Sequence, residues 1–233
     1  MKIGCPTEIK PQEFRVGMTP VATQEATANG HQVFIQKGAG AGAGFSDADY
    51  AAAGATLLDT PAEIFATADM IVKVKEPQAV ERKMLREGQL LFTYLHLAPD
   101  PVQTKGLVDS GAIAIAYETV TDANGGLPLL APMSEVAGRM APQAGAHCLE
   151  KAAGGRGVLL AGVPGVTAGR VLVIGGGVAG TNAARVAVGM GAEVTILERN
   201  VARIRQLDDY FNGRVRVLYS TVDSLERLVV SAD

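Results

Sequence analysis

Apolar and polar residues alternate in blocks along the chain, and the blocks predict strands and helices in turn. Seven short runs are rich in apolar residues, and most are almost continuously apolar, as parallel strands buried on both faces are. These runs are Lys2–Cys5, His31–Gln36, Met70–Lys75, Leu90–Leu95, Ile113–Glu118, Val171–Ile174 and Val194–Glu198. The alternation of strands with helices predicts an α/β fold with right-handed crossover connections.

Several intervening segments carry recognisable helix starts. Thr19-Pro20 and Thr60-Pro61 each put a capping side chain before a proline at the first helical position. Ser46 and Ser134 are further N-cap candidates, and a long helix is predicted over Ser134–Lys151.

A glycine motif follows the strand predicted at Val171–Ile174. Gly175, Gly177 and Gly180 have the spacing G-x-G-x-x-G, a helix is predicted over Thr181–Met190, and Glu198 ends the next strand. In this context the first glycine permits a tight turn, the second lets the backbone approach a pyrophosphate, and the third lets helix and strand pack closely. Glu198 would accept hydrogen bonds from both ribose hydroxyls of an adenosine, which favours NAD over NADP.

The motif also shapes the predicted domain organisation, which is two Rossmann-like α/β domains. Residues 1–128 are expected to form an N-terminal substrate and catalytic domain. Residues 129–233 are expected to form a linker helix and the first part of the NAD-binding Rossmann domain. A full dinucleotide fold needs about six strands, and about three are expected after Arg170, so the second domain is expected to be incomplete.

Charge and cysteine content narrow the class of function. The 233 residues include 21 Lys and Arg against 24 Asp and Glu, a net charge of −3, which argues against nucleic acid or an anionic membrane as partner. The two cysteines, Cys5 and Cys148, make neither a disulfide framework nor a metal site, and they favour the reducing cytoplasm. The longest uncharged run, Gly157–Gly169, is too short to span a bilayer.

Three titratable residues fall at or beyond the ends of predicted strands, where α/β sheets bind ligands. Arg15 lies in the loop after the first strand, Lys75 ends Met70–Lys75, and His96 follows Leu90–Leu95. Arg pairs bidentately with a carboxylate, Lys polarises a carbonyl, and His carries a proton at neutral pH. A small oxo- or amino acid needs these types, although each residue alone is also compatible with a structural role.

At these residues the sequence resembles the alanine dehydrogenase family and, more broadly, the N-terminal portions of pyridine nucleotide transhydrogenases. The block Tyr94–Ala98 favours the alanine enzyme. The matching stretches, which cover nearly the whole chain, are Pro6–Lys10, Arg15–Pro20, Val72–Pro77, Phe92–Ala98, Ala116–Val120, Pro128–Met140 and Leu159–Gly165.

The resemblance implies a homohexamer that reversibly deaminates L-alanine to pyruvate and ammonium with NAD. It implies that Arg15 and Lys75 bind the substrate and that His96 is the catalytic acid and base. The residues it assigns to NAD contacts are Ser134, Val178, Ala179, Glu198, Arg203 and Ser220. Glu198 stands where the family has an aspartate, which keeps the charge and the expected preference for NAD.

The resemblance also leaves alternatives open. Family members continue well past Asp233, so the rest of the NAD domain and a catalytic aspartate are expected to lie outside this sequence. One alternative is a transhydrogenase-type subunit that exchanges hydride between nucleotides. Another is a truncated, inactive nucleotide-binding or assembly module. Arg199 and Arg203 could each bind a phosphate, so NADP stays an alternative cofactor.

Overall fold

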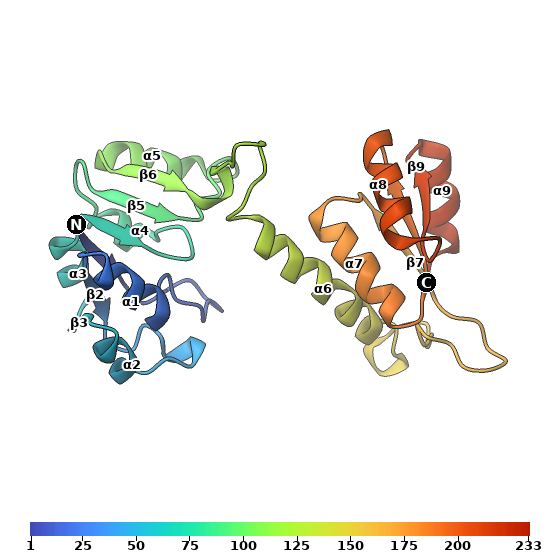
Figure 1. The fold of residues 1–233 in the computed structure, drawn as a ribbon, viewed down its shortest axis with the longest axis horizontal. Coiled ribbons are helices and arrows are strands. Elements are labelled where there is room, and N and C mark those ends of the chain that lie inside the picture. The colour runs from blue at the N-terminus through green and yellow to red at the C-terminus, as the bar shows by residue number, and fades with distance from the viewer. The chain divides into compact units, whose positions relative to one another are not determined.

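The computed structural model describes every residue from Met1 to Asp233 and divides them into two units, Met1–Leu129 and Leu130–Asp233. In Figure 1 the first unit runs from blue to green and the second from yellow-green to red. Each unit contains one sheet in which all neighbouring strands are parallel, with helices between successive strands. The predicted class, α/β with two Rossmann-like domains, is confirmed.

The sheet of the first unit has six strands in the order β3-β2-β1-β4-β5-β6. Chain order and spatial order diverge between β1 and β4, as in a complete doubly wound sheet, and ligands of such sheets bind at this reversal beyond the carboxyl ends of the strands. The strands are β1 (Lys2–Cys5), β2 (Gln32–Gln36), β3 (Thr56–Leu58), β4 (Met70–Val72), β5 (Leu90–Thr93) and β6 (Ile113–Ala116).

Helices cover both faces of this sheet, and their starts follow the capping chemistry of the sequence. Thr19, Ser46 and Thr60 each accept a backbone N–H of the first turn, which confirms three predicted N-caps. Two buried clusters form the core, one including Ile35 and the other including Leu91. The helices are α1 (Pro20–Ala28), η1 (Ala41–Ala43), α2 (Asp47–Ala52), α3 (Pro61–Thr67), α4 (Ala79–Arg82), α5 (Pro101–Ser110) and η2 (Tyr117–Thr119).

The second unit contains three parallel strands in the order β7-β8-β9, the arrangement of one mononucleotide-binding half. The strands are β7 (Arg170–Ile174), β8 (Glu193–Glu198) and β9 (Arg216–Tyr219). The helices are α6 (Ala131–Cys148), η3 (Lys151–Ala153), α7 (Val178–Gly189), α8 (Val201–Phe211) and α9 (Val222–Ser231). Helices α6 and α7 lie side by side (Figure 1), and a Cβ at Gly138 of α6 would overlap the Ala179 carbonyl oxygen.

The structure corrects several element boundaries. Ser134 is not an N-cap, because α6 begins at Ala131 with Leu130 at the capping position and carries a proline in its first turn. Proline is tolerated there, since the first N–H groups of a helix have no partner within it. Helix α7 begins at Val178, three residues earlier than predicted. No helix of the structure has the length and apolar character needed to cross a membrane.

Candidate active site

The first candidate site lies where the strand order reverses in the N-terminal unit. Arg15 is on the loop between β1 and α1, Lys75 lies three residues after β4, and His96 lies three residues after β5. Strands β1, β4 and β5 are consecutive neighbours in the sheet. The three predicted residues therefore follow the same edge of the sheet, beyond the carboxyl ends of its central strands.

Arg15 is held by a carboxylate of its own loop. Its backbone N–H and Nε donate to Glu13 Oε1 at 3.0 and 2.8 Å, and its Nη2 donates to Glu13 Oε2 at 2.6 Å. These bonds to Arg15 lower the pKa of Glu13 to about 2, and the charge of Lys75 adds to the effect. The Arg15 side chain keeps 46 % of its surface exposed, so the guanidinium is oriented and still accessible.

Lys75 is the accessible one of two lysines in the run Lys73–Lys75. Lys73 is 1 % exposed and pairs with two carboxylates, whereas Lys75 is half-buried. Thr93 Oγ1, at the end of β5, donates to the Lys75 carbonyl oxygen at 3.0 Å. The loop that carries Lys75 is therefore tied to the neighbouring strand while its side chain stays available.

His96 has an unusual backbone conformation that a carboxylate stabilises. Its φ is 51°, in the left-handed region that side-chain-bearing residues rarely adopt. Glu118 Oε1 accepts the N–H of His96 at 2.6 Å and that of Leu95 at 3.1 Å. The Tyr94 ring stacks on the imidazole with centroids 6.1 Å apart, and its hydroxyl donates to the Leu129 carbonyl at 2.6 Å. These contacts define the orientation of an exposed histidine.

The second candidate site is the glycine loop between β7 and α7. Gly175 has a φ of 94°, and its N–H donates to the Leu197 carbonyl at 2.7 Å. A Cβ at Gly180 would overlap the Gly175 carbonyl oxygen, so packing requires that glycine. A Cβ at Gly177 would meet no protein atom within 4 Å. Protein packing does not explain this glycine, and the open space beside it fits the approach of a diphosphate to the amino end of α7.

Glu198 at the end of β8 already holds three backbone groups. Its Oε2 accepts Gly176 N–H at 2.8 Å, and its Oε1 accepts the N–H groups of Arg199 at 2.7 Å and Asn200 at 2.9 Å. The bonds from Asn200 and Gly176 lower the pKa of Glu198. A carboxylate has about four acceptor positions, so roughly one remains for a ribose hydroxyl.

Arg203 supports the loop from the first turn of α8. Its Nε donates to the Gly176 carbonyl at 2.8 Å, and its Nη2 donates to Thr181 Oγ1 at 2.9 Å. The guanidinium thus holds the glycine loop through its backbone. Arg199 is exposed just after Glu198, and its backbone N–H binds that carboxylate.

The remaining predicted cofactor residues border the same loop. Val178 and Ala179 form the first turn of α7, and Ser220 directly follows β9 with its N–H bonded to the Glu198 carbonyl at 2.9 Å. Ser134 lies one turn before Gly138 on the same face of α6, and Gly138 contacts Ala179. The glycines, Glu198 and Ser220 thus share the carboxyl edge of the three-stranded sheet.

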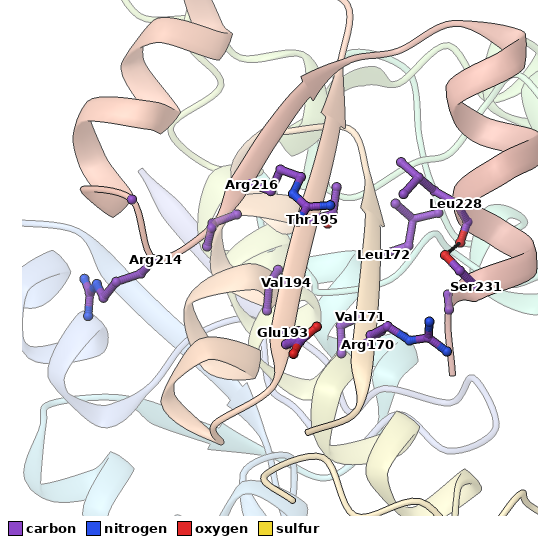
Figure 2. A pocket seen from close by; sticks show the side chains of 13 residues that line it. Arg170, Val171, Leu172, Glu193, Val194, Thr195, Arg214, Arg216, Leu228 and Ser231 are labelled. Carbon is purple, nitrogen blue, oxygen red and sulfur yellow. Dashed lines mark hydrogen bonds between the residues drawn. The ribbon is translucent and has the colours of Figure 1, made fainter. Parts of the chain in front are cut away.

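A hollow at the other end of this sheet is a poorer candidate. It has a volume of about 670 Å³ and includes Arg170, Glu193 and Arg216, the first residues of the three strands. Figure 2 shows the side chains of this hollow, with Leu228 and Ser231 contributed by α9. It lies at the amino ends of the strands, away from the glycine loop. No group of three or more His, Cys, Asp or Glu residues is arranged to hold a metal ion.

Sequence reasoning missed three residues that shape the first site, namely Glu13, Tyr94 and Glu118. Glu13 had a visible signal, because an acid two positions before a candidate arginine can pair with it. Glu118 reaches the His96 backbone through the pairing of β5 with β6, which no local sequence pattern predicts. Tyr94 stacks on His96 two positions further on and bonds the Leu129 carbonyl, and no local sequence pattern predicts that bond.

Topology and loops together define a doubly wound α/β protein with a complete sheet and a glycine-loop unit. Models of the alanine dehydrogenase/PNT N-terminal and C-terminal domains match residues 4–137 and 141–233. The chain therefore belongs to the alanine dehydrogenase/PNT family.

Individual relatives agree with this membership. The chain is 59 % identical over 233 residues to a protein of Halomonas elongata named alanine dehydrogenase, and it spans 63 % of that protein's length. A solved L-alanine dehydrogenase superposes with a TM-score of 0.94 at 50 % identity, over all of this chain and 64 % of that one. A Sinorhizobium meliloti transhydrogenase structure, with a TM-score of 0.83 at 22 % identity over all of this chain and 68 % of that one, shares the fold.

Proposed function

We propose that this chain carries the substrate site and part of the cofactor site of an alanine dehydrogenase. The reaction converts L-alanine, NAD⁺ and water reversibly to pyruvate, ammonium, NADH and a proton. The observation that carries the proposal is the grouping of Arg15, Lys75 and His96 beyond three adjacent central strands, in a chain of this family.

Arg15 and Lys75 are proposed to bind pyruvate or alanine. A guanidinium offers two parallel N–H donors to a carboxylate, and an ammonium stabilises negative charge on the C2 oxygen. Glu13 holds the Arg15 guanidinium before the substrate arrives, which reduces the ordering that binding requires.

His96 is proposed to move the proton at the C2 oxygen. In the direction of amination, ammonia adds to pyruvate C2, and His96 donates a proton to the oxygen that leaves as water. In the reverse direction it accepts a proton from the attacking water. The stacked Tyr94 ring lies against the imidazole, and the Glu118 carboxylate holds the His96 backbone that carries it.

The glycine loop is proposed to bind NAD. The contacts assigned to it are the residues of the second site, namely Ser134, Gly175, Gly177, Val178, Ala179, Gly180, Glu198, Arg203 and Ser220. When bound, the nicotinamide supplies the hydride acceptor or donor. The open space beside Gly177 supports diphosphate binding at the amino end of α7. The ionised Glu198 supports NAD over NADP, because it repels a 2′-phosphate.

The proposal extends to the assembly and the location of the protein. We propose a cytoplasmic homohexamer, from the family and from two cysteines that are both free. Sedimentation of the purified chain tests the oligomer. A species of any other size would contradict this part of the proposal.

The proposed function is tested by alanine-dependent NADH formation at alkaline pH and by titration of the folded chain with pyruvate. We expect Arg15→Ala to weaken pyruvate binding about 10- to 100-fold, the value of a charged hydrogen-bonded pair. Lys105→Ala is the control, because it removes another ion-paired cation on the surface. If the Arg15→Ala variant bound pyruvate as tightly as the wild-type chain, the assigned substrate site would be contradicted. Absence of any binding to the wild-type chain would contradict the proposed function.

A further inference from the structure

Three ionisable side chains are buried together, and one of them bonds the backbone of Lys75 in the first candidate site. Lys73 is 1 % exposed, and the side chains of Glu8 and Glu81 are each 2 % exposed. Lys73 Nζ lies 3.2 Å from Glu8 Oε2 and 2.7 Å from Glu81 Oε1. Removing three charges from water is costly, and pairing offsets only part of that cost. Stability alone therefore does not explain why these three side chains are buried together.

The two carboxylates of this cluster have different second partners. Glu8 Oε1 accepts the Val74 N–H at 2.7 Å, and its Oε2 accepts the Lys75 N–H at 3.4 Å. Glu81 Oε2 instead accepts the Gln78 N–H at 2.7 Å, at the start of α4. Glu8 therefore holds the backbone that carries Lys75, and Glu81 does not.

Glu8 also belongs to the loop that carries Arg15. That loop meets the end of β4 and the segment after it at two further points. A Cβ at Gly17 would lie 2.6 Å from the Val72 carbonyl oxygen, and Lys10 forms an ion pair with Glu76. The strand order reverses between β1 and β4, so these contacts join the two loops that border the reversal.

Resting on the proposed function, we infer that Glu8 is a positioning residue, which fixes the separation of Arg15 and Lys75 by binding the Val74–Lys75 backbone from the Arg15 loop. Its carboxylate binds the Lys73 ammonium and the Val74 and Lys75 N–H groups, and it is assigned no step of the reaction. It selects substrates in which a carboxylate and a carbonyl are adjacent, because the two cations that recognise these groups cannot move apart.

Two substitutions separate this role from the effect of charge. Glu8→Gln and Glu81→Gln each remove one buried negative charge and leave Lys73 with one carboxylate. Through charge alone, both would leave pyruvate binding unchanged or strengthen it, because pyruvate is an anion. Only Glu8→Gln removes an acceptor from the Val74–Lys75 backbone, since an amide has one acceptor oxygen where the carboxylate has two.

The experiment is a pyruvate titration of the three folded full chains, followed by the amide signals of Val74 and Lys75. We expect Glu8→Gln to shift both amide signals and to weaken binding about tenfold or more. We expect Glu81→Gln to leave both amides and the affinity near the wild-type values. If the glutamine variant does not fold, Glu8→Asp keeps the charge and shortens the reach by one methylene, with the same expected result.

The outcomes distinguish this inference from the proposed function. If the wild-type chain binds no pyruvate, the proposed function fails, and the role of Glu8 fails with it. If the wild-type chain binds pyruvate and the Glu8 variant binds equally well, only the positioning role is overturned. Equal weakening in the Glu8 and Glu81 variants would also overturn it, because the effect would then not depend on the bonds from Glu8 to the Val74–Lys75 backbone.

Discussion

The loops after the first strand of each unit differ in length and in what they offer a ligand. Residues 6–19 separate β1 from α1, whereas only Gly175–Gly177 separate β7 from α7. The short loop brings the amino end of a helix to the sheet edge, so that backbone N–H groups and the helix dipole face an anion. The long loop supplies side chains at the same edge, among them Glu8, Glu13 and Arg15.

This difference shows how one topology serves two kinds of recognition. A diphosphate is a large anion, and a row of backbone N–H groups suits it without charged side chains. A small oxo acid has two different polar groups close together, and distinct side chains are needed to tell them apart. In the two proposed sites, the length of the loop after the first strand decides which kind of recognition each unit uses.

The largest effect is expected from the side-chain site. His96→Ala should lower alanine-dependent turnover by about 10²- to 10⁴-fold, because the proton at the C2 oxygen loses its carrier. His147→Ala is the matched control, since that histidine is exposed on α6 and pairs only with Glu150 at 3.5 Å. Near-normal turnover in the His96 variant would contradict its assignment as acid and base. The first site would then have no residue assigned to proton transfer.

The backbone site is tested by a pair of glycine variants. Gly180→Ala should destabilise the second unit by about 3 kcal/mol or more, because the added Cβ would overlap a backbone oxygen that cannot move aside. Gly177→Ala should change the free energy of unfolding by about 1 kcal/mol or less, the value of an N-cap preference. It should still weaken NADH binding about tenfold or more, the effect of a clash of about 1.4 kcal/mol.

NADH fluorescence and thermal melting measure these two variants side by side. The chain contains no Trp, so its own fluorescence interferes little with the nucleotide signal. NADH affinity that is unchanged in a folded Gly177→Ala variant would show that the open space beside this glycine is not where the diphosphate binds.

The smallest effect concerns the pH dependence of the Arg15 loop. The pKa of Glu13 falls from an ordinary 4.5 to about 2 in the folded protein, with its bonds to Arg15 as the main cause. The lowered value means that the pair contributes stability above pH 4.5 and loses it as the pH falls toward 2. Because Arg15 is 46 % exposed, solvent reduces this contribution to about 1 kcal/mol or less.

Glu13→Gln should therefore reduce the loss of stability that the protein suffers as the pH falls below 5. We expect the melting temperature of the wild-type chain to fall about 2–4 °C further than that of the variant between pH 5 and pH 2. Asp109→Asn, which breaks an exposed pair with Lys105, should leave the curve nearly parallel to the wild type. If the melting temperatures of the wild type and of Glu13→Gln fell equally between pH 5 and pH 2, the Glu13–Arg15 pair would not be what organises the Arg15 loop.

Sequence patterns predicted five of the six strands of the first unit's sheet and missed β3. Continuous apolar runs such as Leu90–Leu95 predict buried strands, because burial on both faces leaves no polar alternation. Strand β3 is Thr56–Leu58, where only two consecutive residues are strongly apolar. Strand β4 is equally short, but it begins the longer predicted run Met70–Lys75. Likewise Ser134 has a capping side chain, but helix α6 begins earlier at Ala131, since the first turn of a helix tolerates a proline.

The candidate residues were predictable, and the groups that hold them were not. Lys75 and His96 lie just beyond apolar strands, and Arg15 lies in the loop after the first strand, placements that are visible along the chain. Glu8 and Lys73 are 65 positions apart, and only the pairing of β1 with β4 brings them together. Nothing in the run Lys73–Lys75 shows which lysine is buried, because that depends on where β4 ends.

The contrast between the two sheet edges is tested most directly by amide signals of the wild-type chain during separate titrations with pyruvate and NADH. We expect pyruvate to shift the signals of Lys75 and His96, and NADH to shift those of Gly176, Gly177 and Val178. Pyruvate that shifts only the glycine-loop signals, or NADH that leaves those signals unmoved at saturation, would contradict the assignment of the two sites.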